Sequence, residues 1–596
     1  MNRVETACHI AQMQTDAFLE EFLPPKLSIN DEETAINSIL SNISIFDCLA
    51  QADGSEPERY RLKMKLTEHA WKGTGLYLRN MHRWNETQSN IEITGNIVVY
   101  YSDDDSNRRM PHDVGEENQN TFTTPVPTFI ASDYTSTAST ASVKPTNMIV
   151  LSSVARKSNI THHTDEVVPY PTFSANSRAP LNEPEEYVTL IDFQGIEPTT
   201  EETDLKYGDD HQEQIGKYAG QILPHHRCHL FSIATTHNTA HFLRWDHSGV
   251  IASNPIDFST KVGLRTFITF LHRFAYVCPR ERGHDTTVLN PTAKDLEQLK
   301  SFMDNNLPNL PPNHKEFFRE AFTDDNWALR IVELKLSDHH RMKENPLEAT
   351  DKRIRLLIGV PQQYSDRSFS LFGRATKGFV ALDVDKKKLK FLKDTWRYNG
   401  ASYHPELDVY ERLHKHGVKN IATVEGGGDV LDPDPEVARS KWKVQETASH
   451  RYIKTDNLVH LPQVHHRLLI RQLGTPMEKY HSSLSLSYYL SIIIAGHRDA
   501  WTNANVLHGD ISPSNMLICE SPEDGVTAAF LVNWDMCRYK EDLNDGPSHK
   551  KFVPECGHSN PHYFFAIQRN NSTLRTTWNP SFMSSTGFAF ASIHMT

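Results

Sequence analysis

The spacing of apolar residues divides the first third of the chain into a helical region and a long polar stretch. Residues 10–23 and 37–51 repeat apolar side chains at helical intervals, with two adjacent prolines between them as helix breakers. Residues 102–185 are rich in Ser, Thr and Pro and poor in large apolar side chains, so they cannot bury enough surface to become ordered. The pattern predicts a mostly helical region over residues 1–100 and a disordered linker over residues 101–205.

Ordered patterns return after this linker. Residues 211–223 have helical periodicity, and residues 228–253 carry short apolar runs separated by turn residues, which predicts two or three strands. Residues 259–277 predict a buried helix, and residues 280–350 are mostly polar and helical in spacing. We assign residues 206–350 to one subdomain.

A second ordered region opens near residue 353 and mixes strands with helices. The stretch KKKLKFLKDTWR, residues 386–397, begins with an alternating apolar strand and precedes a helix over 405–418. A further apolar strand at 465–470 leads to a strongly apolar helix at 484–501. The order of these elements predicts an α+β fold.

Composition and charge narrow the classes of partner. The 596 residues allow roughly three or four domains, and the 62 basic and 75 acidic residues include no long basic run, which argues against nucleic acid as a partner. Seven cysteines without a CxxC pair argue against both a disulfide framework and a zinc site. The N-terminus is acidic where a signal peptide needs an apolar run, and no window reaches 18 uninterrupted apolar residues. We expect a soluble intracellular protein, cytoplasmic or nuclear, with no membrane partner.

The stretch LHGDISPSNMLI, residues 507–518, carries the most informative spacing of polar residues. His508, Asp510 and Asn515 follow the apolar helix, and the asparagine lies five residues after the aspartate. In phosphotransferases this arrangement lets the aspartate orient or deprotonate the attacking hydroxyl, while the asparagine binds magnesium. Asp535, which ends the next predicted hairpin, supplies a second carboxylate for the metal. The loop predicts a catalytic centre with Mg²⁺.

A glycine-rich loop precedes it in the right order. Gly373, Gly378 and Val380 match three of the four fixed positions of the loop that covers the phosphates of ATP in kinases, with Ala375 in place of the middle glycine. The alternative is an ordinary hairpin, because two glycines near a valine are common. The loop gains support from the residues that follow it.

Those residues predict the rest of a nucleotide site. Lys393 follows an alternating apolar strand and is the candidate to hold the α and β phosphates. Glu406 or Glu411 can reach back to it from the next helix, and we favour Glu406 because it lies a full helix length before the glycine that ends the helix. Gln472 and Gly474 lie in the connector that is expected beside the adenine pocket.

Six tracts together resemble the fungal-type protein kinase family. They are HFLRWDHSGVIASNPIDF, SLFGRATKGFVALDVDKKKLKFLKDTWR, VYERLHKHGV, RLLIRQLGTPM, LHGDISPSNMLI and LVNWDM, which span roughly residues 205–540. The resemblance implies a bilobal protein kinase-like fold with a preceding α/β subdomain, and transfer of phosphate from ATP with Mg²⁺ to Ser or Thr hydroxyls of a protein. It assigns residues 351–475 to the N-terminal lobe and hinge, and residues 476–596 to a partial C-terminal lobe.

Departures from the family pattern keep two alternatives open. Gly509 replaces the arginine that links the catalytic loop of many kinases to a phosphorylated activation loop, so activation of that kind is not expected. The HGD spelling also occurs in small-molecule kinases. Only 61 residues follow Asp535, and they contain no APE-like anchor, which predicts a truncated C-terminal lobe. The alternatives are therefore a truncated pseudokinase that acts as a nucleotide-binding or regulatory module, and a small-molecule kinase.

Overall fold

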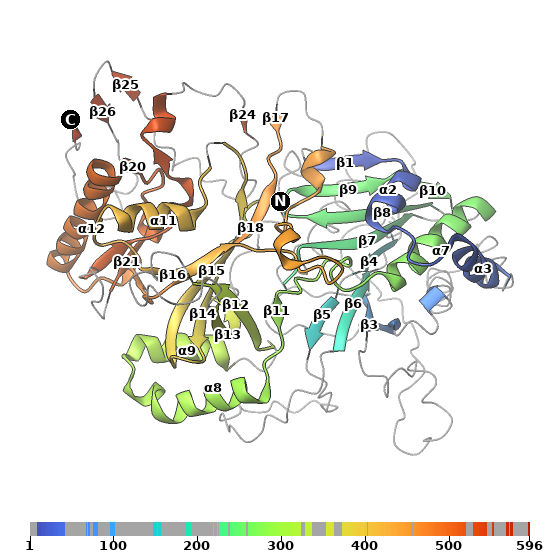
Figure 1. The fold of residues 1–596 in the computed structure, drawn as a ribbon, viewed down its shortest axis with the longest axis horizontal. Helices are drawn as coiled ribbons and strands as arrows, with labels where there is room; N and C mark the ends of the chain where they lie inside the picture. Colours follow the sequence, from blue (N-terminus) through green and yellow to red (C-terminus); the bar gives the residue numbers. More distant parts are fainter. Residues whose placement is uncertain are drawn as a thin grey trace, which may run out of the picture.

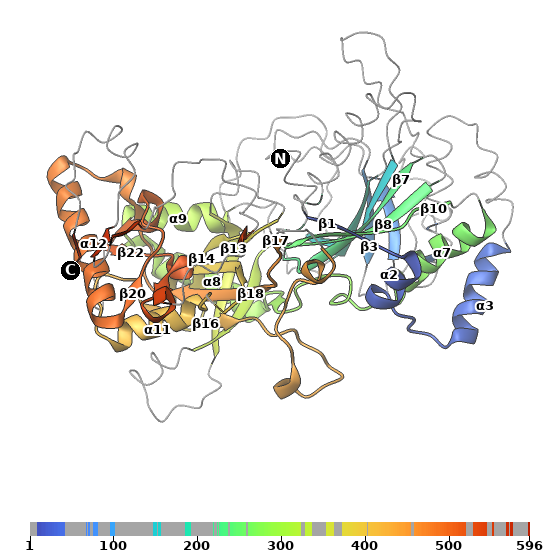
Figure 2. The same ribbon diagram turned by 90° about the horizontal axis from the view of Figure 1, so that it is seen from above.

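The computed structural model describes two large sheets that lie side by side, with helices at the outer ends (Figures 1 and 2). The described residues are 9–41, 67, 70–71, 219, 223, 226–236, 239–257, 260–323, 328–336, 353–362, 372–401, 403–453, 458–519 and 528–544, together with the backbones of short strands within 76–191 and 551–595. None of the helices in these ranges is both long and apolar enough to cross a membrane.

A six-stranded sheet forms the subdomain that precedes the kinase-like region. Its order is β1-β9-β8-β7-β4, with β10 paired to β8, and β1 runs parallel to β9. The strands are β1 (Ile10–Met13), β4 (Asn147–Leu151), β7 (His229–Thr236), β8 (Thr239–Asp246), β9 (Gly249–Ser253) and β10 (Ile256–Asp257). The predicted strands of residues 228–253 are thus three, β7 to β9.

Helices α2 (Thr15–Phe22), α3 (Ile29–Leu40) and α7 (Lys261–Tyr276) pack against this sheet. Aromatic side chains from α7, such as Phe270, stack on Phe242 of β8 with ring centroids 4.1 Å apart. The helical spacing over residues 10–23 was misleading at its start, because residues 10–13 form β1. There the pairing with β9 overrides local periodicity, as tertiary contacts often do.

A smaller sheet has the order β2-β3-β6-β5 and is described by its backbone alone. Its strands are β2 (Leu76–Asn80), β3 (Asn96–Tyr101), β5 (Ser153–Arg156) and β6 (Glu185–Ile191). β4, β5, β6 and the last residue of β3 fall inside the range that the sequence predicts as a linker, and the other residues of that range lie outside the described part of the chain. The domain boundaries stay predictions.

A seven-stranded antiparallel sheet forms the N-terminal lobe, in the order β11-β12-β13-β14-β15-β18-β16. The strands are β11 (Val288–Leu289), β12 (Arg330–Lys335), β13 (Arg353–Pro361), β14 (Lys377–Asp383), β15 (Lys388–Tyr398), β16 (Val424–Asp429) and β18 (Gln463–Ile470). Helices α8 (Ala293–Asn305) and α9 (Pro312–Phe322) pack below β13 and β14 in Figure 1, and α11 (Glu406–Lys415) lies between the sheet and the C-terminal lobe.

The C-terminal lobe is built around α12 (Ser483–Ala504), which ends at Asn505 in a left-handed conformation. Against it lie the short strands β19 (Thr475–Pro476), β20 (Val506–Leu507), β21 (Met516–Ile518), β22 (Ala529–Leu531) and β23 (Arg538–Tyr539). Their apolar side chains form one core with α11, so the two lobes share packing. The predicted truncation of this lobe concerns residues that lie almost wholly outside the described part.

A buried polar network joins the N-terminal lobe to the segment that follows α7. Arg467 of β18 donates from Nε to Asp394 Oδ2 at 2.8 Å and also pairs with Asp285. His465 Nε2 lies 3.0 Å from the other oxygen of Asp394. Successive residues of a strand point to opposite faces, so Asp394 faces this network while Lys393 faces the lobe interface. The network holds the back of the sheet that presents Lys393.

Candidate active site

Lys393 lies at the centre of the interface between the lobes. Its Nζ donates to Glu406 Oε2 at 2.7 Å, to Asn533 Oδ1 at 2.5 Å and to Asp535 Oδ2 at 3.2 Å, and the residue is 6% exposed. Burial by itself lowers the pKa of the ammonium, but the Asp535 and Glu406 carboxylates outweigh burial and raise it. Lys393 therefore stays charged at neutral pH.

The structure pairs Lys393 with Glu406, which is the partner that we favoured over Glu411. Glu406 is the first residue of α11, where the helix dipole stabilises a negative charge. Its second oxygen, Oε1, accepts a hydrogen bond from the backbone N–H of Trp534 at 3.0 Å. The carboxylate thus ties the lysine to the segment that carries Asp535.

The predicted catalytic loop is held by its own side chains. His508 Nε2 lies 2.9 Å from the carbonyl oxygen of Val532, and its Nδ1 accepts from the Asp510 N–H at 3.2 Å. These partners fix a neutral ring, and burial accordingly lowers the pKa of His508 to about 4. Asn515 Nδ2 donates to the Asp510 carbonyl at 2.7 Å and to Asp510 Oδ2 at 3.0 Å. His508 shapes the loop, and Asn515 orients the Asp510 carboxylate.

Gly509 has a steric reason to replace the arginine of other kinases. Its φ is +84°, a left-handed conformation that favours glycine, and a Cβ there would lie 2.3 Å from the carbonyl oxygen of Met536. The loop passes so close to the segment after Asp535 that only glycine fits.

Asn533, which the sequence analysis did not single out, connects these groups. Its Oδ1 accepts from Lys393, and its Nδ2 donates to Asn515 Oδ1 at 3.1 Å. The backbone of Asn533 is left-handed, with φ 68° and ψ 59°. A continuous chain of hydrogen bonds therefore runs from Lys393 through Asn533 and Asn515 to Asp510. The available signal was its place two residues after the end of β22 and two residues before the aspartate.

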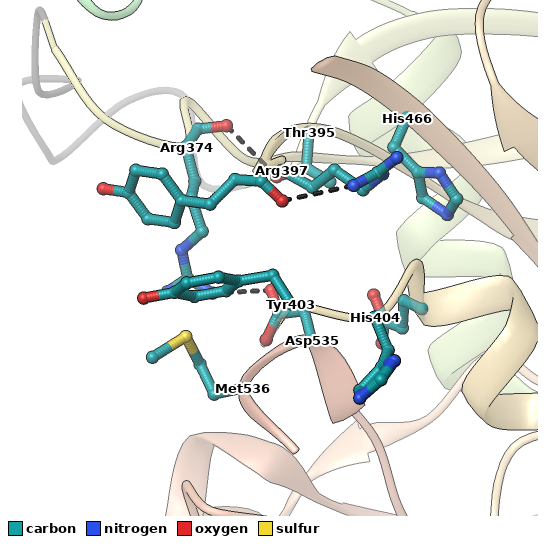
Figure 3. A pocket seen from close by; sticks show the side chains of 10 residues that line it. Arg374, Thr395, Arg397, Tyr403, His404, His466, Asp535 and Met536 are labelled. Atoms are coloured by element: carbon teal, nitrogen blue, oxygen red, sulfur yellow. Dashed lines mark hydrogen bonds and ion pairs between the residues drawn. The ribbon is translucent and has the colours of Figure 1, made fainter. Parts of the chain in front are cut away.

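Asp535 faces the glycine loop. Its Oδ2 pairs with Arg374 Nη1 at 2.5 Å as well as with Lys393, while Oδ1 is buried without a hydrogen-bond partner. Figure 3 shows Asp535 in a pocket with Arg374, Tyr403, His404 and Met536. Burial alone raises the pKa of this carboxyl, but the charges of Arg374 and Lys393 outweigh burial and hold it well below its usual range.

Asn515 and Asp535, the two predicted magnesium ligands, have different hydrogen-bond partners. Asn515 is bonded to Asp510 and Asn533, whereas Asp535 is bonded to Lys393 and Arg374. A site for Mg²⁺ needs hard oxygen ligands that converge with their negative charge available. Here the only charge of the pair is already balanced by two cations, so the two residues do not fit a magnesium site in this arrangement.

The glycine loop lies between β13 and β14, and its end is anchored to the subdomain. Gly373, with φ +113°, donates its N–H to the carbonyl oxygen of His247 at 2.8 Å. Phe372 stacks on His9 with ring centroids 4.8 Å apart. Ala375 has a φ of +41°, so it keeps the left-handed backbone of the glycine that it replaces. Residues 363–371 of the loop lie outside the described part.

The other predicted cofactor residues are engaged by the protein itself. Val380 is fully buried in the cluster that α8 and α9 form on the sheet, on the face that carries Lys393. Gln472 accepts from the Thr423 N–H and donates to the Thr423 hydroxyl, both at 2.9 Å. Gly378 and Gly474 leave room for packing, because a Cβ would lie 2.6 Å from Phe391 and Leu517 respectively. These four positions hold the hinge and sheet together.

Two buried histidines of the C-terminal lobe predict a pH effect on stability. Burial lowers the pKa of His497 to about 3 and that of His508 to about 4, both below the ordinary 6.5. The unfolded chain therefore binds more protons between these values, so stability is complete above pH 6.5 and falls as the pH drops. Between pH 7 and pH 5, we expect the free energy of unfolding of His497→Gln to fall by about 2 kcal/mol less than that of the wild type, as measured by urea unfolding.

The exposed His481 provides the control for this measurement. His481→Gln should keep the pH dependence of the wild type. An unchanged pH dependence in His497→Gln would contradict the buried, neutral state of His497.

Comparison with known proteins identifies the family of the chain. A family model described as fungal protein kinase matches residues 182–568, which is more than half of the chain. Among solved structures, the ROP18 kinase domain in complex with AMP-PNP and sucrose is 13% identical, with a TM-score of 0.20 over 42% of this chain and 68% of that chain. A TM-score this low carries no argument about the fold. A search of curated proteins found no match. The family match confirms the resemblance seen in the sequence: the chain belongs to the fungal protein kinase family.

Proposed function

We propose that the chain transfers the γ-phosphoryl group of ATP to Ser or Thr hydroxyls of a protein. The observation that carries this proposal is the hydrogen-bonded chain from Lys393 to Asp510, because it joins a buried cation to a carboxylate across the lobe interface. A cation for the nucleotide phosphates and a carboxylate for the acceptor hydroxyl are two of the parts that phosphoryl transfer requires of the protein.

Each residue of the site has a separate role in the proposed reaction. Lys393 binds the α and β phosphates, and Glu406 positions it. Asp510, oriented by Asn515, accepts the proton of the acceptor hydroxyl. At the same time the hydroxyl oxygen bonds to the γ phosphorus, and the bond between the γ phosphorus and the β-phosphate oxygen breaks. Arg374 can leave Asp535 for the phosphates, since an arginine fork suits phosphate oxygens.

Replacement of Lys393 by methionine tests the nucleotide site. We expect Lys393→Met to weaken binding of a fluorescent ATP analogue at least tenfold, because a charged hydrogen bond contributes about 1.5–3 kcal/mol. Lys388→Met is the matched control, since Lys388 lies on the same strand and is exposed. Equal affinities of the two variants, both folded by circular dichroism, would remove Lys393 from the site.

Two observations favour the pseudokinase as the second candidate. α8 and α9 cover Val380 on the face that presents Lys393, and Arg374 already neutralises Asp535. A chain that binds nucleotide through Lys393 but transfers no phosphate to itself or to a mixture of proteins would be a pseudokinase.

A further inference from the structure

We infer that Asn533, rather than Asp535, stands at the metal position of this site, and that its neutral amide makes nucleotide binding by the wild-type chain nearly independent of divalent cations. The inference rests on the proposed nucleotide site at Lys393. It assigns a role to a residue that the sequence motif did not reveal.

The position of Asn533 follows from its two partners. In protein kinases the metal ions are held by the asparagine of the catalytic loop and by the aspartate of the segment that follows. The side chain that meets Asn515 here is Asn533, with Nδ2 at 3.1 Å from Asn515 Oδ1. The Val532 N–H also donates to the Asn515 carbonyl at 3.0 Å, so the two segments are in register at this point.

The orientation of both amides is fixed by groups that can play only one part. Lys393 is only a donor, so the oxygen of Asn533 must face it and Nδ2 must face Asn515. Asn515 Nδ2 faces two oxygens of Asp510, so its Oδ1 must face Asn533. The N–H of Asn533 therefore lies where a cation would have to bridge the two residues.

Asp535 is the competing position, because its Oδ1 is buried without a hydrogen-bond partner. However, the Trp534 N–H is held by Glu406 and the Trp534 side chain is fully buried, which turns Asp535 toward Arg374 and the pocket of Figure 3. Neither Asp510 nor Asn515 lines that pocket. Asp535 thus pairs with Lys393 and Arg374 rather than with residues of the catalytic loop.

A change of Asn533 to aspartate should create the missing metal ligand. The substitution replaces the Nδ2 donor by an oxygen that faces Asn515 Oδ1 across about the same gap, so two acceptors repel each other. A divalent cation between them removes that repulsion and adds a charge pair. Lys393, at 2.5 Å from the other oxygen, keeps the new carboxylate ionised.

The test compares nucleotide affinity in EDTA and in millimolar Mg²⁺, with a fluorescent ATP analogue, for the full chain. We expect Mg²⁺ to change the affinity of the wild type less than about threefold and to strengthen that of Asn533→Asp at least about tenfold. Asn505→Asp is the matched control, because Asn505 has the same left-handed backbone but lies exposed at the end of α12. It should behave as the wild type.

A second readout needs no nucleotide. Without divalent cations Asn533→Asp should melt below the wild type, and Mg²⁺ or Mn²⁺ alone should raise its melting temperature by about 2–4 °C while leaving the wild type and Asn505→Asp unchanged. A wild type that binds no nucleotide would overturn the proposed function and the nucleotide part of the inference, whereas the metal position of Asn533 would still be decided by this melting result.

Two results would overturn the inference and leave the proposed function intact. One is a wild type whose affinity rises tenfold or more in Mg²⁺ and loses that gain in Asp535→Asn, which would make Asp535 the ligand. The other is an Asn533→Asp variant in which divalent cations change neither the melting temperature nor the nucleotide affinity.

Discussion

Replacing Arg467 with alanine is expected to lower the free energy of unfolding by about 3–5 kcal/mol, the largest stability effect of any single change considered for this chain. The guanidinium is buried at 1% exposure between Asp285 and Asp394, and its Nη1 also donates to the Thr287 hydroxyl at 2.7 Å. Without it Asp285 loses its arginine counter-charge, and Asp394 keeps only His465 at 3.0 Å and Lys377 at 3.6 Å. Urea unfolding of the variant and the wild type at pH 7 measures the difference.

The deficit should shrink on acidification. Burial alone raises the pKa of Asp285, but Arg467 and His465 outweigh it and hold that pKa well below its usual range, so the wild type loses this contribution only at very low pH. In the variant the folded-state pKa values of Asp285 and Asp394 rise, so protonation relieves the buried charge. We expect a smaller difference between the two proteins at pH 4.5 than at pH 7.

An exposed arginine provides the control for both measurements. Arg498 pairs with its neighbour Asp499, and its side chain is 64% exposed. Arg498→Ala should change stability by no more than about 0.5 kcal/mol at either pH. If Arg467→Ala lowers the free energy of unfolding as little as this control does, the buried network does not stabilise the contact between the N-terminal lobe and the segment that follows α7.

The parts of the site that sequence reasoning reached are those that local spacing encodes. Lys393, which lies inside β15 although the sequence placed it after a strand, and Glu406 at the start of α11 meet as expected, since strand, turn and helix geometry place them. The catalytic loop likewise brings Asp510 and Asn515 together within six residues. Each of these pairs lies on neighbouring elements of the chain.

The parts that escaped depend on contacts between distant segments. Asn533 and Asp535 are two residues apart after a strand, and only the left-handed turn at Asn533 decides which of them meets the catalytic loop. β1 has helical spacing, yet it pairs with β9 some 240 residues later. The anchoring of Gly373 to His247 also joins separate regions. Hydrophobic periodicity is a local property, so it does not predict contacts between residues that are far apart in the sequence. No sequence motif indicates these contacts either.

Asp510→Asn is expected to lower phosphotransfer at least about 100-fold while leaving nucleotide affinity within about threefold of the parent. The amide keeps the size and the hydrogen bond from Asn515 to the Asp510 carbonyl, but it cannot accept the proton of the acceptor hydroxyl. Lys393, the proposed ligand of the nucleotide phosphates, is untouched, so chemistry and binding should separate. The readout is transfer of labelled γ-phosphate from ATP to the chain itself and to a mixture of proteins.

The same change in the Asn533→Asp background decides what limits the wild type. If the neutral amide at Asn533 is the limit, Asn533→Asp raises transfer in Mg²⁺, and adding Asp510→Asn abolishes the gain, because the metal position and the base act on one reaction. Asp304→Asn, on the exposed face of α8, is the control and should leave transfer unchanged. Transfer that survives Asp510→Asn in both backgrounds would take the base role from Asp510. Nucleotide binding without transfer in any of these proteins would place the chain among the pseudokinases.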